Sequence, residues 1–208
     1  MYPMPEFQEK DRDAIVGFMR EYPLATIVTH TEGGLVATHV PVITRIEGDT
    51  VKLRGHVMRN TDHWRGFVAS PNVLATFHGP NCAIPASWYP ERDNGGTWNY
   101  MAAHAHGTLT MLPQEDLIEI LRELKESNEP DPARTFDTLS QEYLARMLPA
   151  IQAFEIKVER LEAVFKLSQN RDDASFATVV RNLTARGGWS ADVARHMAAR
   201  RASAAANQ

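Results

Sequence analysis

Short runs of alternating hydrophobic and polar residues dominate the first half of the chain. The alternation predicts three strands joined by glycine-containing turns, at residues 24–30, 35–44 and 50–57. In the third strand Val51, Leu53 and Gly55 alternate with polar residues, so one face is expected to pack inward. Consecutive strands joined by short turns predict an antiparallel meander.

Further strands are predicted beyond this meander. They cover 73–78, a short extended piece at 82–84 after a break at Gly79 and Pro80, 97–112, and 151–165. In the last of these, Phe154, Ile156 and Val158 alternate with charged residues, which is typical of a strand with one solvent-exposed face. The loop at 85–96 is rich in proline, glycine and aromatic residues, and loops of this length in a compact domain tend to be functional.

Helical spacing of apolar residues predicts helices between and after the strands. They cover 11–22, one turn around Trp64 and Phe67, a segment that opens at Pro113 and ends within 127–132, 140–148, 174–186 and 191–202. Strands in consecutive hairpins, with no G-x-G-x-x-G after a strand, do not fit a Rossmann fold. The pattern predicts an α+β domain in which about six or seven mainly antiparallel strands close into a small barrel with peripheral helices.

The composition is that of a globular intracellular protein. With 208 residues, 43% hydrophobic and 23% charged, the chain can bury one large core. The single cysteine, Cys82, can form no internal disulfide, and the first residues lack the pattern of a secretory signal. No apolar stretch approaches the roughly 20 residues that span a bilayer, so we expect a cytoplasmic protein with no membrane partner. A net charge of −4 gives no overall attraction to DNA.

Residues 55–64, GHVMRNTDHW, join a strand end to a helix start. Such a junction presents backbone N–H groups and the positive end of a helix dipole, and Arg59 adds a guanidinium that can grip a phosphate in two places. The segment is therefore a candidate phosphate site. The alternative is that Arg59 is a solvated surface charge and that Asn60 or Thr61 only caps the helix.

Residues 166–171, KLSQNR, directly follow the last predicted strand. Two cations, an amide pair and a hydroxyl within six residues can hydrogen-bond a sugar chain, a phosphate or the edge of a heteroaromatic ring. A polar turn with a helix cap explains the same residues equally well.

Aromatic residues gather in two segments, PASWY at 85–89 and TWNY at 97–100. Aromatic side chains on a loop can wall a planar ligand or fill a subunit interface, and core packing is the alternative. For Trp98 and its neighbours we expect a ligand or an interface.

The eight histidines do not predict a metal site. His104 and His106 would share one strand face, but no carboxylate or thiol lies near them in the chain to complete a site. His39 and His56 are set apart because they end strands near the candidate pocket. No G-x-S-x-G, Walker loop or H-E-x-x-H occurs, so hydrolase motifs give no support and no catalytic residue is assigned.

Several of these segments together resemble the PaiB family. They are MYPMPEF at the start, ATHVPV at 37–42, GHVMRNTDHW, SWY, TWNY and FKLSQNR at 165–171, in the family's order up to about Arg171. The family is described as FMN-binding split barrels that act as negative transcriptional regulators, and it is similar to the wider group of flavin split barrels. The resemblance implies an FMN-binding split β-barrel and a homodimer with FMN at the subunit interface.

The resemblance also implies a set of FMN-binding residues. His56, Arg59 and Asn60 would belong to the pocket, with Lys166, Gln169 and Asn170 nearby, Trp98 and Asn99 close to the ring or the partner chain, and His39 at the same pocket. Relatives often carry Ala-Lys where this chain has Met58 and Arg59, which shifts or weakens the phosphate contact. Residues 1–171 would form the FMN-binding domain, with 172–208 a helical extension packed on it.

Three functions remain open at this stage. The first is an FMN-binding protein with oxidoreductase chemistry supplied by the flavin. The second is a regulator that contacts DNA, for which the predicted C-terminal helices offer Arg181, Arg186, Arg195, Arg200 and Arg201, although no convincing helix-turn-helix is present. The third is a haem-binding split barrel, which rests on fold analogy and on the number of histidines.

Overall fold

The chain folds as an α+β protein built on one mainly antiparallel sheet. The computed structural model describes residues 1, 4–90 and 93–206. Over these residues the sheet has eight strands, in the hydrogen-bonded order β3-β2-β6-β7-β8-β5-β4, with the short β1 paired to β8. The pairs β2 with β3 and β4 with β5 are antiparallel hairpins, as the alternating pattern predicts. The α+β class is therefore confirmed.

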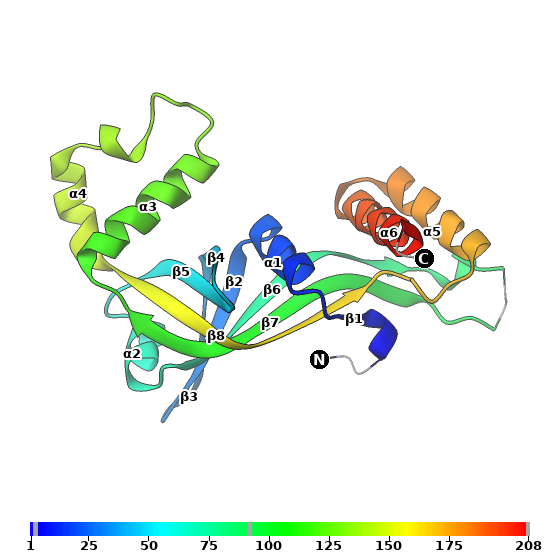
Figure 1. The fold of residues 1–208 in the computed structure, drawn as a ribbon, viewed down its shortest axis with the longest axis horizontal. Coiled ribbons are helices and arrows are strands. Elements are labelled where there is room, and N and C mark those ends of the chain that lie inside the picture. The colour runs from blue at the N-terminus through cyan, green and yellow to red at the C-terminus, as the bar shows by residue number, and fades with distance from the viewer. Residues whose placement is uncertain (2–3, 91–92, 207–208) are drawn as a thin grey trace. The chain divides into compact units, whose positions relative to one another are not determined.

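The elements follow one another along the chain in the order shown by colour in Figure 1. They are η1 (Pro5–Phe7), β1 (Gln8–Glu9), α1 (Arg12–Glu21), β2 (Leu24–Thr31), β3 (Gly34–Pro41), β4 (Ile43–Glu47), β5 (Thr50–Met58), α2 (Asp62–Ala69), β6 (Asn72–Ile84), η2 (Ala86–Trp88), β7 (Thr97–Met111), α3 (Gln114–Asn128), η3 (Phe136–Thr138), α4 (Gln141–Met147), η4 (Leu148–Ala150), β8 (Ile151–Lys166), α5 (Asp173–Arg186) and α6 (Gly188–Ala206).

Two compact units are assembled from discontinuous parts of the chain. The first unit comprises Met1–Phe18, His78–Ala103 and Glu162–Gln208, and the second comprises Met19–Phe77 and His104–Leu161. The long strands β6, β7 and β8 contribute residues to both units. The C-terminal helices α5 and α6 belong to the first unit.

In the second unit, α2 packs on one face of the β2–β3 hairpin. Gly66 of α2 lies so close to the hairpin that a Cβ at this position would be 2.8 Å from Val36 Cγ2 and 3.0 Å from Thr31 Cγ2. A small residue is needed there because any side chain would push the helix away from the strands. A separate cluster joins Leu117 and Ile120 of α3 to the start of β8. These contacts fix the two ends of the β5–α2 segment, which carries the first candidate site.

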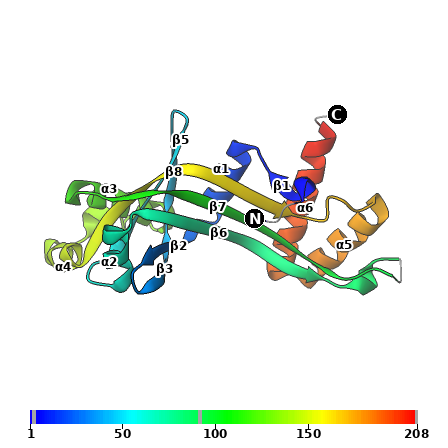
Figure 2. The same cartoon turned by 90° about the horizontal axis from the view of Figure 1, so that it is seen from below.

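In the first unit, α5 and α6 lie next to each other, as Figures 1 and 2 both show. Their shared interior contains buried apolar side chains, namely Phe176, Val179, Leu183, Val193 and Met197. The N-terminal segment joins the same unit through β1, in which Gln8 pairs with Val164 of β8. The end of β8 and the turn after it are therefore held between the N-terminal segment and the C-terminal helices.

The prediction of a single strand at 35–44 is wrong, because the chain changes its hydrogen-bonding partner strand within this segment. Pro41 at the end of β3 pairs with Leu24 of β2, whereas Ile43 at the start of β4 pairs with Arg54 of β5. Val42 between them is buried, and its backbone N–H donates to the Pro23 carbonyl at 2.9 Å. Residue-by-residue alternation cannot report which strand lies opposite, so this break left no signal in the sequence.

The predicted break at Gly79 and Pro80 is also wrong. β6 runs unbroken from Asn72 to Ile84, and only the alternation of buried and exposed positions slips there, since Gly79 and Pro80 are both buried. A Cβ on Gly79 would lie 2.7 Å from Cε2 of Phe18, so the glycine makes room for an aromatic ring. The remaining predicted helices and strands are confirmed to within a few residues at their ends.

Candidate functional site

The turn between β5 and α2 brings together three of the residues singled out in the sequence. Asn60 adopts a left-handed backbone conformation with φ 64°, which an asparagine tolerates better than most residues. Thr61 then caps α2, because its hydroxyl accepts a hydrogen bond from Trp64 N at 3.2 Å and donates one to the Met58 carbonyl at 2.9 Å. The helix cap expected as an alternative role for Thr61 is therefore present.

Arg59 is fixed by the start of β8. Its backbone N–H donates to the Ala150 carbonyl at 2.9 Å, and its Nε donates to the Ile151 carbonyl at 3.0 Å. Within the described part of the chain, the two terminal guanidinium nitrogens have no hydrogen-bond partner. The side chain is partly buried and already anchored, so an anion that meets these nitrogens would not have to order a free arginine.

His56 lies on β5, three residues before Arg59 and opposite Ala153 of β8. Its Nδ1 atom is buried and has no hydrogen-bond partner among the described residues. Burial lowers the pKa of the His56 ring, because the charged form loses hydration without gaining a counter-charge. A neutral imidazole with one unsatisfied buried nitrogen is suited to a polar ligand, since such an atom costs free energy until it is paired.

His39 lies apart from this turn, on the edge strand β3, where it pairs with Thr26 of β2. Its side chain is exposed. The other predicted site residues belong to the first unit.

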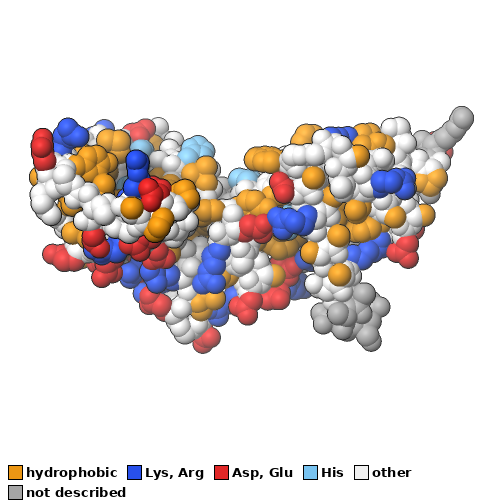
Figure 3. All heavy atoms as spheres, turned by 90° about the horizontal axis from the view of Figure 1, so that it is seen from above, with side chains coloured by type: hydrophobic (Ala, Val, Ile, Leu, Met, Phe, Trp, Pro, Cys, Tyr) orange, Lys and Arg blue, Asp and Glu red, His pale blue; other side chains and the backbone are white. Residues whose placement is uncertain are grey.

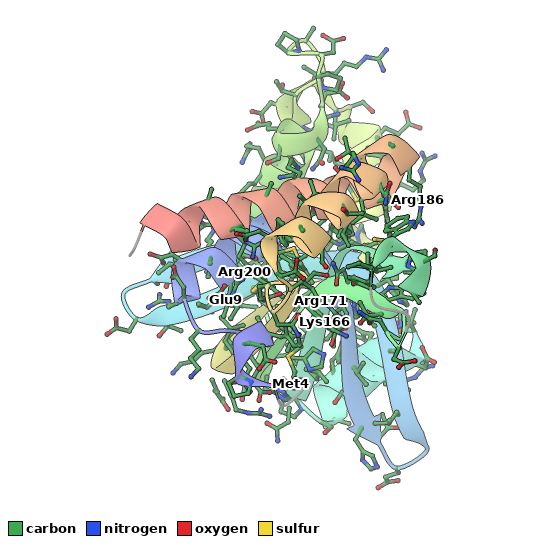
Figure 4. The ribbon with its side chains drawn as sticks, turned by 90° about the vertical axis from the view of Figure 1, so that its right-hand side faces the viewer. Met4, Glu9, Lys166, Arg171, Arg186 and Arg200 are labelled. Atoms are coloured by element: carbon green, nitrogen blue, oxygen red, sulfur yellow. The ribbon has the colours of Figure 1, made fainter. Side chains whose placement is uncertain are left out.

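In the first unit, Lys166 ends β8 with its Nζ donating to Thr97 Oγ1 at 2.8 Å. Burial, and next the positive charge of Arg171, lower the pKa of Lys166. Figure 4 shows Lys166 and Arg171 in the same region, below α5 and α6. The two cations raise the local positive potential, which favours an anion at this end of β8.

Asn99 and Gln169 use their amide groups inside the protein. Asn99 is fully buried and bonds Ser168, while Gln169 accepts from Leu167 N at 2.7 Å and donates to the carbonyls of Phe165 and Glu6 at 2.7 and 3.1 Å. Both residues therefore shape the turn after β8 in this structure. Their assignment to an FMN pocket stays a prediction.

The two other residues of this group are open to solvent. Trp98 is 52% exposed and its Nε1 donates to Asn81 Oδ1 at 3.1 Å, and Asn170 is exposed. The contact of Trp98 and Asn170 with a ligand or a partner chain stays a prediction.

Two arginine–aromatic stacks involve the loop at 85–96, and the sequence analysis did not predict them. The guanidinium of Arg171 lies 4.4 Å from the centre of the Tyr89 ring, and that of Arg186 lies 4.6 Å from the centre of the Trp88 ring. They tie the aromatic loop to the turn after β8 and to the end of α5. Glu91 and Arg92 of this loop lie outside the described residues. Only spatial pairing reveals such stacks, because the partners are about 80 to 100 residues apart.

The C-terminal arginines considered for DNA contact are mostly engaged within the chain. Arg186 donates to the Ala83 carbonyl, Arg200 pairs with Glu9, and Arg201 pairs with Asp173 and donates to the Arg171 carbonyl. On the face drawn in Figure 3, basic side chains over α5 and α6 are scattered among hydrophobic ones. A continuous basic stripe, the usual electrostatic footprint of nucleic-acid binding, is not what these helices present on that face.

Among the described residues, no group of three or more His, Cys, Asp or Glu side chains is arranged to hold a metal ion. No described helix combines the length and apolar character that a membrane crossing requires.

Comparison with known proteins adds the family. Residues 1–160 match the family described as "Putative FMN-binding domain". Across 186 residues the chain is 36% identical to the Bacillus subtilis (strain 168) "Protease synthase and sporulation protein PAI 2", covering 88% of this chain and 89% of that protein.

Solved structures support the split-barrel fold. The FAD and heme binding protein from Mycobacterium smegmatis superposes with a TM-score of 0.58 at 16% identity, covering 88% of this chain and 80% of that one. The flavocytochrome Anf3 from Azotobacter vinelandii superposes with a TM-score of 0.58 at 14% identity, covering 83% and 75%. At such low identity these likenesses concern the fold, and the sequence match carries the identification: the chain belongs to the PaiB family, whose shared region is an FMN-binding domain of the split-barrel fold.

Proposed function

We propose that this chain works as a homodimeric flavoprotein that holds the phosphate of FMN at the β5–α2 turn. The observation that carries the proposal is that the anchored guanidinium of Arg59 and the unsatisfied buried Nδ1 of His56 belong to residues only three positions apart in the chain, at the end of β5. An arginine can grip a phosphate with two parallel hydrogen bonds. The neutral His56 ring can hydrogen-bond a polar edge of the ligand.

The residues fit FMN as a polar and anionic ligand. Arg59 would bind the phosphate, and the left-handed turn at Asn60 would face it. The ligand would also give the Nδ1 atom of His56 the hydrogen-bond partner that it lacks. His39 would contribute from β3 of the same unit, whereas the assignment of Lys166 and Trp98, which belong to the first unit, stays a separate prediction. Bound FMN supplies electron and hydride transfer chemistry, whereas the chain's own residues bind and orient it.

The dimer is supported by an uncharged face of the sheet in the second unit. Strand pairing places ten partly or fully exposed residues on one side of β2, β3 and β6, and none is Asp, Glu, Lys or Arg; they are Leu24, Thr26, Val28, His30, Leu35, Ala37, His39, Pro41, Leu74 and Thr76. The helix α2 packs on the opposite side of the hairpin, through Thr29, Thr31 and Val36. A face without charges can meet a second copy of itself without repulsion between like charges.

A flavin titration tests the proposal. FMN added to the purified protein is expected to show saturable quenching of its fluorescence, and Arg59→Gln is expected to weaken binding by about tenfold or more, because a charge-assisted phosphate contact is lost. Arg45→Gln is the matched control, since Arg45 is an exposed arginine of the same unit paired with Glu123. Lack of saturable FMN uptake by the wild-type protein would refute the proposal.

Direct DNA contact through α5 and α6 is disfavoured by the internal pairing of Arg186, Arg200 and Arg201. A gel shift with the promoter region of the protein's own gene, repeated over a salt series, separates the two functions. We expect no salt-sensitive shift. A shift that weakens steeply with salt would show that phosphate contacts are made and would favour the DNA-binding regulator.

A further inference from the structure

A small pocket lies in the first unit, outside the proposed flavin site. Its volume is about 240 Å³, and its apolar floor is formed by the buried side chains of Leu167, Phe176 and Met197. The rim is formed by Glu6, Gln169, Arg200 and Arg201. The pocket combines one apolar surface with two guanidinium groups.

Arg201 is held in place without a strong ionic partner. Its guanidinium stacks 4.0 Å from the centre of the Phe176 ring, and its Nη2 donates to the Arg171 carbonyl at 3.0 Å. It forms an ion pair with Asp173 at 3.1 Å, and the side chain of Asp173 is 98% exposed. An ion pair with a solvated carboxylate contributes little free energy, so another anion can replace Asp173 at low cost.

Arg200 differs because its carboxylate partner is sheltered. It pairs with Glu9, whose side chain is only 10% exposed, and it lies 5.7 Å from the centre of the Phe165 ring. This pair fixes α6 to the N-terminal segment, and Figure 4 shows Arg200 and Glu9 directed toward each other. Arg200 therefore has a structural role at the rim, while Arg201 is the arginine that can form an ion pair with an incoming anion.

The surroundings of the pocket favour a negative ligand. The lining residues of the pocket include two guanidinium groups, those of Arg200 and Arg201, and one carboxylate, that of Glu6. The apolar floor requires that the ligand also carry an apolar body. The volume corresponds to about eight water-sized groups, which is below the range of pockets for larger ligands and too small for FMN.

We propose that this pocket binds a small organic anion, a carboxylate attached to a flat apolar body of about the size of a benzene ring. The carboxylate would take the place of Asp173 at Arg201, and the ring would lie against Phe176 and Met197. The site would lie between the turn after β8 and α6, so its occupant would strengthen the attachment of the C-terminal helices.

Benzoate is the probe, and the methyl group of Met197 is the reporter. In the full chain labelled with ¹³C-methyl methionine, benzoate is expected to shift the Met197 signal along a saturable curve, because an aromatic ring placed against the methyl changes its chemical shift. The signal of Met58, which is exposed and lies in the second unit, should not move. The uncharged isostere benzamide is expected to bind at least tenfold more weakly.

A variant pair completes the test. Arg201→Gln is expected to weaken benzoate binding at least tenfold, whereas Arg181→Gln, on the exposed side of α5, should bind as the wild type does. The FMN titration should be unchanged in both variants, which separates this site from the flavin site. Since Arg201→Gln can loosen α6, the comparison of benzoate with benzamide on the wild-type protein decides independently. No saturable shift at Met197, or equal binding of the two probes, overturns the proposal.

Discussion

Asn99 of β7 and Ser168, just after β8, exchange two hydrogen bonds in the interior of the first unit. Asn99 Nδ2 donates to Ser168 Oγ at 2.9 Å, and Ser168 Oγ donates to Asn99 Oδ1 at 3.1 Å. Ser168 has a left-handed backbone with φ 58°, a conformation that costs free energy for a serine. The buried pair therefore holds a strained turn in place, and it does so inside the KLSQNR segment.

Loss of this pair is expected to destabilise the protein. Asn99→Ala leaves the Ser168 hydroxyl buried without its partner, so we expect the free energy of unfolding to fall by about 1–3 kcal/mol. Urea unfolding of both proteins measures the change. Asn170→Ala, at an exposed position two residues before Asp172, the N-cap of α5, is the control and should change the value by no more than about 0.5 kcal/mol. Equal effects of the two substitutions would contradict this role for Asn99.

Two glycines are expected to respond to alanine with opposite signs. A Cβ on Gly107 of β7 would lie 2.1 Å from the Lys157 carbonyl oxygen, a backbone atom that cannot move aside, so Gly107→Ala should cost about 3 kcal/mol or more. Gly17 is exposed within α1 and has no atom within 4 Å of that position, so Gly17→Ala should add about 0.5–1 kcal/mol. Thermal melting of the two variants checks both signs, and a destabilised Gly17→Ala would be evidence against this account.

Stability should depend on pH through His56. Because burial lowers the pKa of this ring in the folded protein, the unfolded chain binds more protons as pH falls through the ordinary value of 6.5. Its contribution to the free energy of unfolding is therefore full above that value and decreases below it. Unfolding curves at pH 7.5 and 5.5 should differ less in His56→Gln than in the wild type. His39→Gln controls for the loss of a histidine, and an unchanged pH dependence in His56→Gln would exclude this source.

A charged side chain introduced on the uncharged face of β2, β3 and β6 is expected to dissociate the proposed dimer. Leu35 is 74% exposed on this face, and Leu35→Glu would place a carboxylate close to its symmetry mate or to apolar groups of the partner. Light scattering of the eluted protein is expected to give the mass of a dimer for the wild type and of a monomer for the variant. Val68→Glu, at a position 57% exposed on α2, should remain dimeric. A monomeric wild type would remove the basis for the dimer.

The sequence was sufficient for most elements and for the family. Strands with one buried face repeat every second residue, and helices repeat their apolar positions over each turn, so β5, β8 and α3 were predicted from local pattern alone. The segments GHVMRNTDHW and KLSQNR also marked two turns that the structure shows to be well ordered by hydrogen bonds. These features depend on neighbours in the chain, which is why they could be predicted.

Only the tertiary structure decided which partner each polar group has. It assigned the amides of Asn99 and Gln169 to the turn after β8, paired Arg200 with Glu9, and left Nδ1 of His56 unsatisfied. It also showed that β4 is a separate strand from β3 and pairs with β5. The physical reason is that a hydrogen bond or an ion pair joins atoms a few ångströms apart, whatever their separation in the chain, whereas periodicity reports only which side of its own element a residue faces.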